Sequence, residues 1–171
     1  MVLCRPATGP DVNKRDHVLN AVLLAVGMGV LLAPALDETT ARTIAMVGVP
    51  VVLGAMVPDI DTAIGDHRKT FHNLLTLGLF LGFPFVFGNL HFVWIGVATH
   101  YVLDLMGNVR GMALFYPWPR EYDVPVGVTV DSKWATVVTL LVTAFELAIF
   151  QGLRVVPPVL PEPVLSGLFP V

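Results

Sequence analysis

Six side chains that bind metals well stand in three short segments of a chain that is otherwise strongly apolar. They are Asp59 and Asp61 in VPDID, His67 and His72 in GDHRKTFHN, and His100 and Asp104 in THYVLD. Ionisable side chains are costly next to or inside an apolar phase, so they persist mainly where they serve a function. Imidazole and carboxylate together are typical ligands of transition metals, and the three segments therefore predict a metal centre.

The spacing of these residues suggests how they could meet. His100 and Asp104 are four residues apart on a predicted helix, which places both on one face, one turn apart. Asp59 and Asp61 are separated by one residue, and in an extended turn both carboxylates would point the same way. His72 begins the next apolar stretch. We expect helix ends and a turn to bring the three segments to one site.

The ligand types favour zinc, with manganese or iron as alternatives. Cys4 is the only cysteine, which excludes an intrachain disulfide and leaves almost no role for thiolate ligands. The candidates outnumber the three protein ligands of a catalytic zinc, so we expect one or two ions. Two metals ~3.5–4 Å apart can clamp both oxygens of a phosphoryl displacement, and bound water would have a pKa of about 7. Arg68, Lys69 and Arg110 are expected to hold a substrate phosphate.

Composition indicates an integral membrane protein. The mean hydropathy is +0.75 and 55% of the residues are hydrophobic, while only 13% are charged. The net charge of -3 and the lack of a basic run exclude a nucleic-acid partner. Residues 1–16 are polar, and the apolar run after them is too long for a signal-peptide core, so we expect a retained span. The 171 residues predict one all-α transmembrane domain.

Five apolar stretches predict about five membrane-spanning helices. They are Val18–Leu36, Thr43–Val57, Asn73–Gly88, Phe92–Leu105 and Trp134–Leu153. The second, third and fourth are shorter than the ~20 residues that cross a bilayer, so their polar ends are expected to sink into a cavity lined by protein. From Val155 the chain is rich in proline and predicts a non-helical tail along the membrane surface.

The basic residues predict the orientation. Eight of the ten lie before the first stretch, between the second and third, or between the fourth and fifth, and only Arg42 and Arg154 lie on the other side. The N-terminus is therefore expected in the cytoplasm. Alternating spans then place the candidate ligands, with His17 added, at the cytoplasmic face. Glu146 lies within the fifth stretch, where it would pair with a neighbouring helix, with Arg42 as a candidate partner, or mark a function.

The order of motifs carries a family resemblance. His17, PDID at 58–61, HR-x3-H at 67–72, H-x3-D at 100–104 and GM-x3-YPWP at 111–119 follow one another. In this order the chain resembles the YdjM-like family of membrane-bound metal-dependent hydrolases, over roughly residues 17–118. The ligand order is also similar to that of the zinc-dependent phospholipase C superfamily.

The resemblance implies a specific division of roles. The implied ligands are His17, Asp59, His72, His100 and Asp104, with Asp104 as a candidate bridge. Asp61 and His67 remain as catalytic candidates, beside the ligands or at a second metal. The chain departs from the family pattern where Lys69, Phe71 and Asn73 replace Gly, Thr and Ser, and where Gly107 replaces a Thr. The departures keep the ligand types and change the residues around them.

Three functions remain open. The first is a membrane-embedded hydrolase that cleaves phosphoester bonds of a lipid or another small phosphorylated substrate. The second is a metal or proton transporter, which would need polar groups at several depths of the membrane. The third is a non-catalytic protein with a structural metal, closed by four protein ligands. Each motif alone is compatible with an ordinary helix end or interfacial loop. All three functions are compatible with an oligomeric protein.

Overall fold

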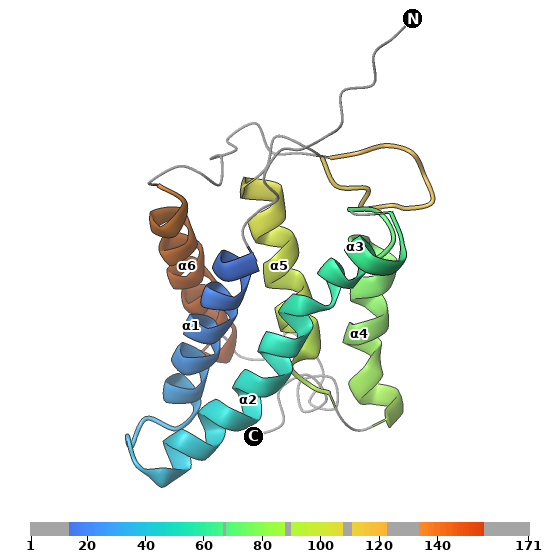
Figure 1. The fold of residues 1–171 in the computed structure, drawn as a ribbon. Coiled ribbons are helices and arrows are strands. Elements are labelled where there is room, and N and C mark those ends of the chain that lie inside the picture. The colour runs from blue at the N-terminus through green and yellow to red at the C-terminus, as the bar shows by residue number, and fades with distance from the viewer. Residues whose placement is uncertain (1–13, 67, 88–89, 108–110, 123–133, 156–171) are drawn as a thin grey trace, which may run out of the picture.

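A computed structural model describes residues 14–66, 68–87, 90–107, 111–122 and 134–155 of the chain (Figure 1). Its elements are α1 (Lys14–Leu32), α2 (Glu38–Met56), the 3-10 turn η1 (Pro58–Ile60), α3 (Asp61–Ile64), α4 (Leu74–Phe87), α5 (Val93–Gly107) and α6 (Ala135–Val155). The described residues contain no β-strand, only one isolated bridge between Met112 and Tyr122. The expected all-α class is confirmed.

The helices have the length and composition of a membrane bundle. Helices α1, α2 and α6 are long and apolar enough to cross a bilayer, whereas α4 and α5 are shorter apolar helices. Successive long helices run in opposite directions, so the starts of α1, α4 and α6 and the ends of α2 and α5 lie at one end of the bundle (Figure 1). We call this the ligand end. The polar segment up to residue 13 and the proline-rich tail from residue 156 lie outside the described residues.

Two helix starts differ from the sequence prediction. Helix α2 begins at Glu38 and has 19 residues, so the expectation of a short second span was wrong. The Asp37 carboxylate caps this helix by accepting hydrogen bonds from the amides of Thr39 and Thr40, at 2.9 and 3.2 Å. Pro50 lies inside the helix without ending it. Helix α1 begins at Lys14, which places His17 one turn inside the helix.

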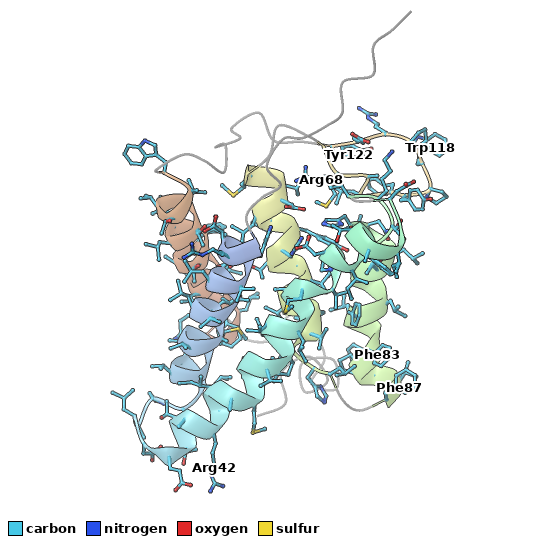
Figure 2. The ribbon with its side chains drawn as sticks, in the orientation of Figure 1. Arg42, Arg68, Phe83, Phe87, Trp118 and Tyr122 are labelled. Carbon is cyan, nitrogen blue, oxygen red and sulfur yellow. The ribbon has the colours of Figure 1, made fainter. Side chains whose placement is uncertain are left out.

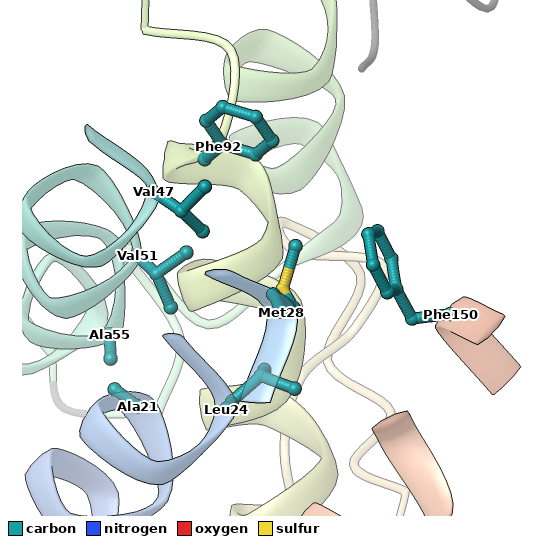
Figure 3. Packing of buried hydrophobic residues seen from close by; sticks show 8 residues of the cluster. All are labelled: Ala21, Leu24, Met28, Val47, Val51, Ala55, Phe92 and Phe150. Carbon is teal, nitrogen blue, oxygen red and sulfur yellow. The ribbon is translucent and has the colours of Figure 1, made fainter. Parts of the chain in front are cut away.

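The apolar core lies among α1, α2, α5 and α6. Its buried side chains, shown in Figure 3, are Ala21, Leu24, Met28, Val47, Val51, Ala55, Phe92 and Phe150. Much of the remaining apolar surface faces outward; Leu75 on α4 and Phe145 on α6, for example, are 79% and 67% exposed. Hydrocarbon can cover such surface, as in a membrane-spanning bundle.

The α2–α5 crossing is built from glycines. A Cβ atom on Gly54 would lie 2.0 Å from the carbonyl oxygen of Val93, and one on Gly96 would lie 2.0 Å from that of Val51. Only hydrogen atoms on these α-carbons allow the two backbones to approach so closely, which is how small residues act at helix contacts in membranes. The crossing fixes α5 against α2 one turn before His100.

The two ends of the bundle differ in character. Arg68, Trp118 and Tyr122 lie at the ligand end, and Arg42 lies at the opposite end (Figure 2). Arg42 pairs with Glu38 of its own helix at 2.6 Å, which corrects the expectation that it pairs with Glu146.

The 111–122 segment lies against the loop that precedes α4: the Ala113 amide donates to the Arg68 carbonyl and the Leu74 amide to the Leu114 carbonyl. The segment thereby braces the loop that carries Arg68 and His72.

Candidate metal centre

Five of the predicted ligands converge at the ligand end of the bundle. His17 comes from α1, Asp59 from η1, His72 from the loop before α4, and His100 and Asp104 from α5. They form two overlapping groups: His17, His100 and Asp104 in one, and Asp59, His72 and His100 in the other. Within each group the ligand atoms lie within 4.8 Å of one another. The helix ends thus bring together residues up to 87 positions apart in the sequence.

His100 and His72 are each oriented by a hydrogen bond at the far side of the ring. His100 Nδ1 donates to the Ala55 carbonyl at 2.7 Å, and His72 Nδ1 lies 2.7 Å from Asp61 Oδ2. A neutral imidazole that donates from Nδ1 carries its lone pair on Nε2. The two Nε2 atoms face each other at 3.2 Å. Two lone pairs at that distance repel unless a proton or a metal ion lies between them.

Asp104 lies at the centre of the cluster. Its Oδ1 is 3.4 Å from His17 Nε2, and its Oδ2 is 3.1 Å from His72 Nε2 and 3.6 Å from His100 Nε2. Asp59 approaches from the other side, with its Oδ1 3.8 Å from His100 Nε2. Acceptor atoms from five side chains therefore point into one region, and nitrogen and oxygen donors of this kind suit zinc, manganese or iron. The residues fit a metal ion.

His17 completes one side of the cluster. Its ring stacks on that of His100, with centroids 3.9 Å apart and planes 12° from parallel. The side chain is 3% exposed, and its Nδ1 has no hydrogen-bond partner among the described atoms. Buried polar atoms are almost always paired, so this nitrogen keeps hydrogen-bonding capacity that the described residues do not use, while Nε2 of the same ring faces Asp104.

The charge around His72 favours a cation. Burial opposes the charged form, but hydrogen bonds to Asp104 and Asp61 and the negative charges of both raise the pKa of His72 to about 9. Without a metal ion, His72 therefore holds a proton at neutral pH. That proton and a metal ion compete for the same nitrogen, Nε2.

Asp59 and Asp61 do not point the same way, which corrects the sequence prediction. The PDID segment forms the turn η1 and the start of α3 instead of an extended turn. Asp59 faces His100, whereas Asp61 is fully buried behind His72 and also accepts from the Phe71 amide at 3.4 Å. A carboxylate in that position can orient the ring of a metal ligand, and the catalytic role expected for Asp61 stays a prediction.

The chain belongs to the YdjM inner membrane protein family. The family's model matches residues 17–160, which include all five converging ligands. Membership establishes a membrane protein of this family and agrees with the resemblance carried by the motifs. The chain matched no curated protein and no solved structure.

Three basic residues were expected to hold a substrate phosphate, and one of them, Arg68, lies beside the candidate ligands. Arg68 is 8% exposed, and its Nη2 is 3.6 Å from Asp104 Oδ1. Its φ of 67° lies in the left-handed region, which non-glycine residues seldom adopt. Lys69 instead pairs with Glu121 at 3.7 Å, away from the ligands. His67 and Arg110 lie outside the described residues.

Two residues that the motif analysis did not select hold the His72 loop in place. The Tyr101 hydroxyl donates to the carbonyls of Phe71 and Asn73, at 2.6 and 3.0 Å. Asn73 donates to the carbonyls of Lys69 and Thr70 and accepts from the amide of Thr76. Their position directly after His100 and His72 in the sequence was the available signal.

A cavity of about 290 Å³ opens beside the candidate ligands. It is lined by His17 and Asp59 together with residues of α1, the end of α2, η1 and α3, among them Val18, Met56 and Ile60. Its polar lining comes from these two candidate ligands and from Thr62, and the other lining residues are apolar. It offers room for a small group next to the cluster.

Proposed function

We propose that this protein is a membrane-embedded, metal-dependent hydrolase that cleaves phosphoester bonds of a lipid or lipid-linked substrate. The observation that carries the proposal is the convergence of three histidines and two aspartates with their acceptor atoms turned inward. Family membership supports the membrane setting, and the ligand chemistry supports zinc, as one or two ions, over manganese or iron.

Asp104 is the residue that would join two ions. Its two oxygens face different histidines, with Oδ1 toward His17 and Oδ2 toward His72 and His100. His100 belongs to both groups of ligands. A metal ion held there would supply a Lewis acid for the phosphoryl oxygens and a source of hydroxide at neutral pH.

The surrounding residues would orient the ligands and the substrate. Asp61 and the Ala55 carbonyl fix the rings of His72 and His100. The Arg68 guanidinium, near Asp104, is suited to donate hydrogen bonds to a phosphate oxygen and to balance its charge. The cavity beside His17 and Asp59 provides space for the reacting group next to the cluster.

The setting favours a lipid as the substrate. The cluster lies where apolar helices end, so a head group could reach the ligands while its apolar chains stay among the helices or in the bilayer. The distribution of basic residues in the sequence supports a cytoplasmic location for this end. We accordingly propose phospholipids or lipid-linked phosphates of the inner leaflet as the substrate class.

The test is hydrolysis by the purified full-length protein loaded with zinc. Fluorescent phospholipids and lipid phosphates in detergent micelles would be separated by chromatography after incubation. We expect product formation that depends on metal, is lost in Asp104→Asn and survives in the matched control Asp66→Asn. Asp66 is exposed on the loop between α3 and α4, and it contacts no candidate ligand in the described residues.

Other outcomes would decide among the alternatives. If the protein hydrolyses no phosphoester but carries zinc into liposomes, the proposal of a hydrolase would give way to that of a transporter. Zinc that binds stoichiometrically, supports neither activity and is required for thermal stability would indicate a structural site.

A further inference from the structure

A second cavity lies between α1, α5 and α6. Its volume is about 220 Å³, several times the ~30 Å³ that one water molecule occupies in the liquid. Apolar side chains form most of its wall, among them Leu24, Met28, Ala98, Ile149 and Phe150. A cavity with such walls is suited to hydrocarbon and not to ordered water. Helix α6 packs mainly on α1 and touches α5 little, so the cavity lies along a weakly joined seam.

One carboxyl group stands in this apolar wall. Glu146 of α6 and Thr99 of α5 both line the cavity. An ionisable group inside a membrane-spanning helix is expensive, faces the protein interior or a cavity, and by default marks a functional site. The metal centre does not use Glu146: neither group of ligands includes it.

Hydrogen bonds around Glu146 all run toward it. Thr143 donates to Asn20, and Asn20 Nδ2 donates to Thr99 Oγ1 at 2.5 Å and to Glu146 Oε2 at 3.3 Å. Thr99 in turn donates to Glu146 Oε1 at 2.5 Å. A carboxylate has about four acceptor sites, and the described donors occupy two of them. At the wall of the cavity, the unused hydrogen-bonding capacity is therefore that of an acceptor.

We propose that this cavity binds an amphiphile with a long apolar chain and one hydrogen-bond donor, a hydroxyl or an amine, which Glu146 accepts. The apolar wall takes the chain, and the carboxyl selects the donor. Few polar groups in a largely apolar cavity are the usual composition of a small-molecule site. The proposal does not rest on the hydrolase activity, because it involves no residue of the metal centre.

Trp94 provides the measurement, because it lines the cavity. The chain has three tryptophans, and the other two, Trp118 and Trp134, are 69% and 67% exposed. In full-length protein carrying Trp118→Phe and Trp134→Phe, Trp94 becomes the sole tryptophan. Its fluorescence is titrated with a terminally brominated long-chain alcohol, the matching amine and the matching alkane.

We expect the alcohol or the amine to quench Trp94 at a concentration about two- to tenfold lower than the alkane, the range that one net hydrogen bond gives. Glu146→Leu should abolish that difference. Glu146→Gln, which keeps a carbonyl acceptor but no charge, should keep a preference for the alcohol. The parent protein could prefer the amine over the alcohol. Loss of that preference in Glu146→Gln would identify a cationic head group.

A blocking variant tests the cavity itself. Ala98→Phe should fill the space and reduce quenching by all three compounds, whereas Val137→Phe, on the exposed face of α6, should leave it unchanged. Should Glu146→Leu fail to fold, Ala98→Phe and Glu146→Gln decide the question. Equal quenching by alcohol, amine and alkane in the parent protein, or full quenching in Ala98→Phe, would overturn the proposal.

Discussion

Two groups of buried polar side chains share α1 and α5, yet they are completed in different ways. In the Asn20 network, Asn20, Thr99, Thr143 and Glu146 satisfy one another, each donor being matched by an acceptor. In the metal cluster, one turn closer to the ligand end along α1, ring nitrogens and carboxylate oxygens crowd together and His17 Nδ1 has no described partner. Every donor of the first group has an acceptor within the protein, whereas the nitrogen and oxygen atoms of the second group could hold a metal ion.

The difference separates buried polar groups that join helices through mutual hydrogen bonds from those that could hold a metal ion. A fully connected network rigidifies the helices it joins, and a partly satisfied one is destabilising on its own. The Asn20 network joins α1, α5 and α6, while the metal cluster joins α1, η1, the His72 loop and α5. Substitutions in the two groups should therefore separate into effects on stability and effects on metal affinity.

The largest expected effect is on metal affinity, with His17→Ala and Asn20→Ala as the matched pair. Removing a ligand costs more than the ~10–100-fold lost when a residue that supports a ligand is removed. We thus expect His17→Ala to raise the dissociation constant for zinc by more than about 100-fold. Asn20→Ala should change it little but lower the free energy of unfolding by about 1–3 kcal/mol, because its partners lose their hydrogen bonds.

Chelator-competition titration measures the first quantity, and denaturant unfolding in detergent measures the second. A His17→Ala protein that binds zinc like the parent, or an Asn20→Ala protein that loses zinc while keeping its stability, would erase the contrast between the two groups.

The next effect concerns the orientation of His72. Asp61→Asn keeps the volume and an acceptor oxygen but removes the charge that holds the His72 ring. We expect zinc affinity to fall about 10–100-fold. Asp66→Asn, on the exposed part of the loop that carries His72, is the control and should leave the zinc affinity unchanged. An Asp61→Asn protein that binds zinc normally but has lost hydrolysis would return Asp61 to the catalytic role suggested by the sequence.

The metal cluster should also respond to pH. Since Asp104 and Asp61 raise the pKa of His72 to about 9, zinc must displace a proton below that pH. Zinc affinity should rise about tenfold per pH unit between pH 7 and 9 and level off above. Stability of the metal-free protein has the opposite sign: the contribution of His72 is fully present below the ordinary pKa of 6.5 and is lost as the pH rises through about 9.

Titrations with zinc at several pH values, repeated with Asp61→Asn, test this coupling. The variant removes one of the two charges that hold the proton, so its affinity should level off at a lower pH. A zinc affinity that does not vary between pH 7 and 9 would contradict a proton held at His72.

Much of the candidate centre could be predicted because helix periodicity and helix alternation are properties of the sequence. The four-residue spacing put His100 and Asp104 on one face, and alternating spans put His17 and His72 at the same end. Periodicity does not determine a turn. The PDID segment folds as η1 and α3, so Asp59 and Asp61 serve different histidines, and only tertiary contacts with His100 and His72 separate them.

The fold was predicted in class and less well at its boundaries. Apolar stretches located the helices, but the capping role of Asp37 extended α2 by a turn beyond the apolar stretch. The sequence also did not predict hydrogen-bond partners. Glu146 accepts hydrogen bonds from Asn20 and Thr99, which are 126 and 47 positions away, and does not pair with Arg42. Such partners depend on which helix faces are in contact, and the tertiary packing of the helices determines those contacts.

The smallest effect on the cluster should come from the α2–α5 crossing, with Gly96→Ala and Gly152→Ala as the matched pair. A Cβ on Gly96 would meet the Val51 carbonyl oxygen at 2.0 Å, so the helices must separate, at a cost of about 1–3 kcal/mol. Gly152, on α6, has open space around it, and alanine there should stabilise by about 0.5–1 kcal/mol. Separation of α2 from α5 stretches the bond from His100 Nδ1 to the Ala55 carbonyl, which orients the ring. Zinc affinity should then fall several-fold in Gly96→Ala alone, and an unchanged affinity would show that His100 is held by its ligand neighbours and not by the crossing.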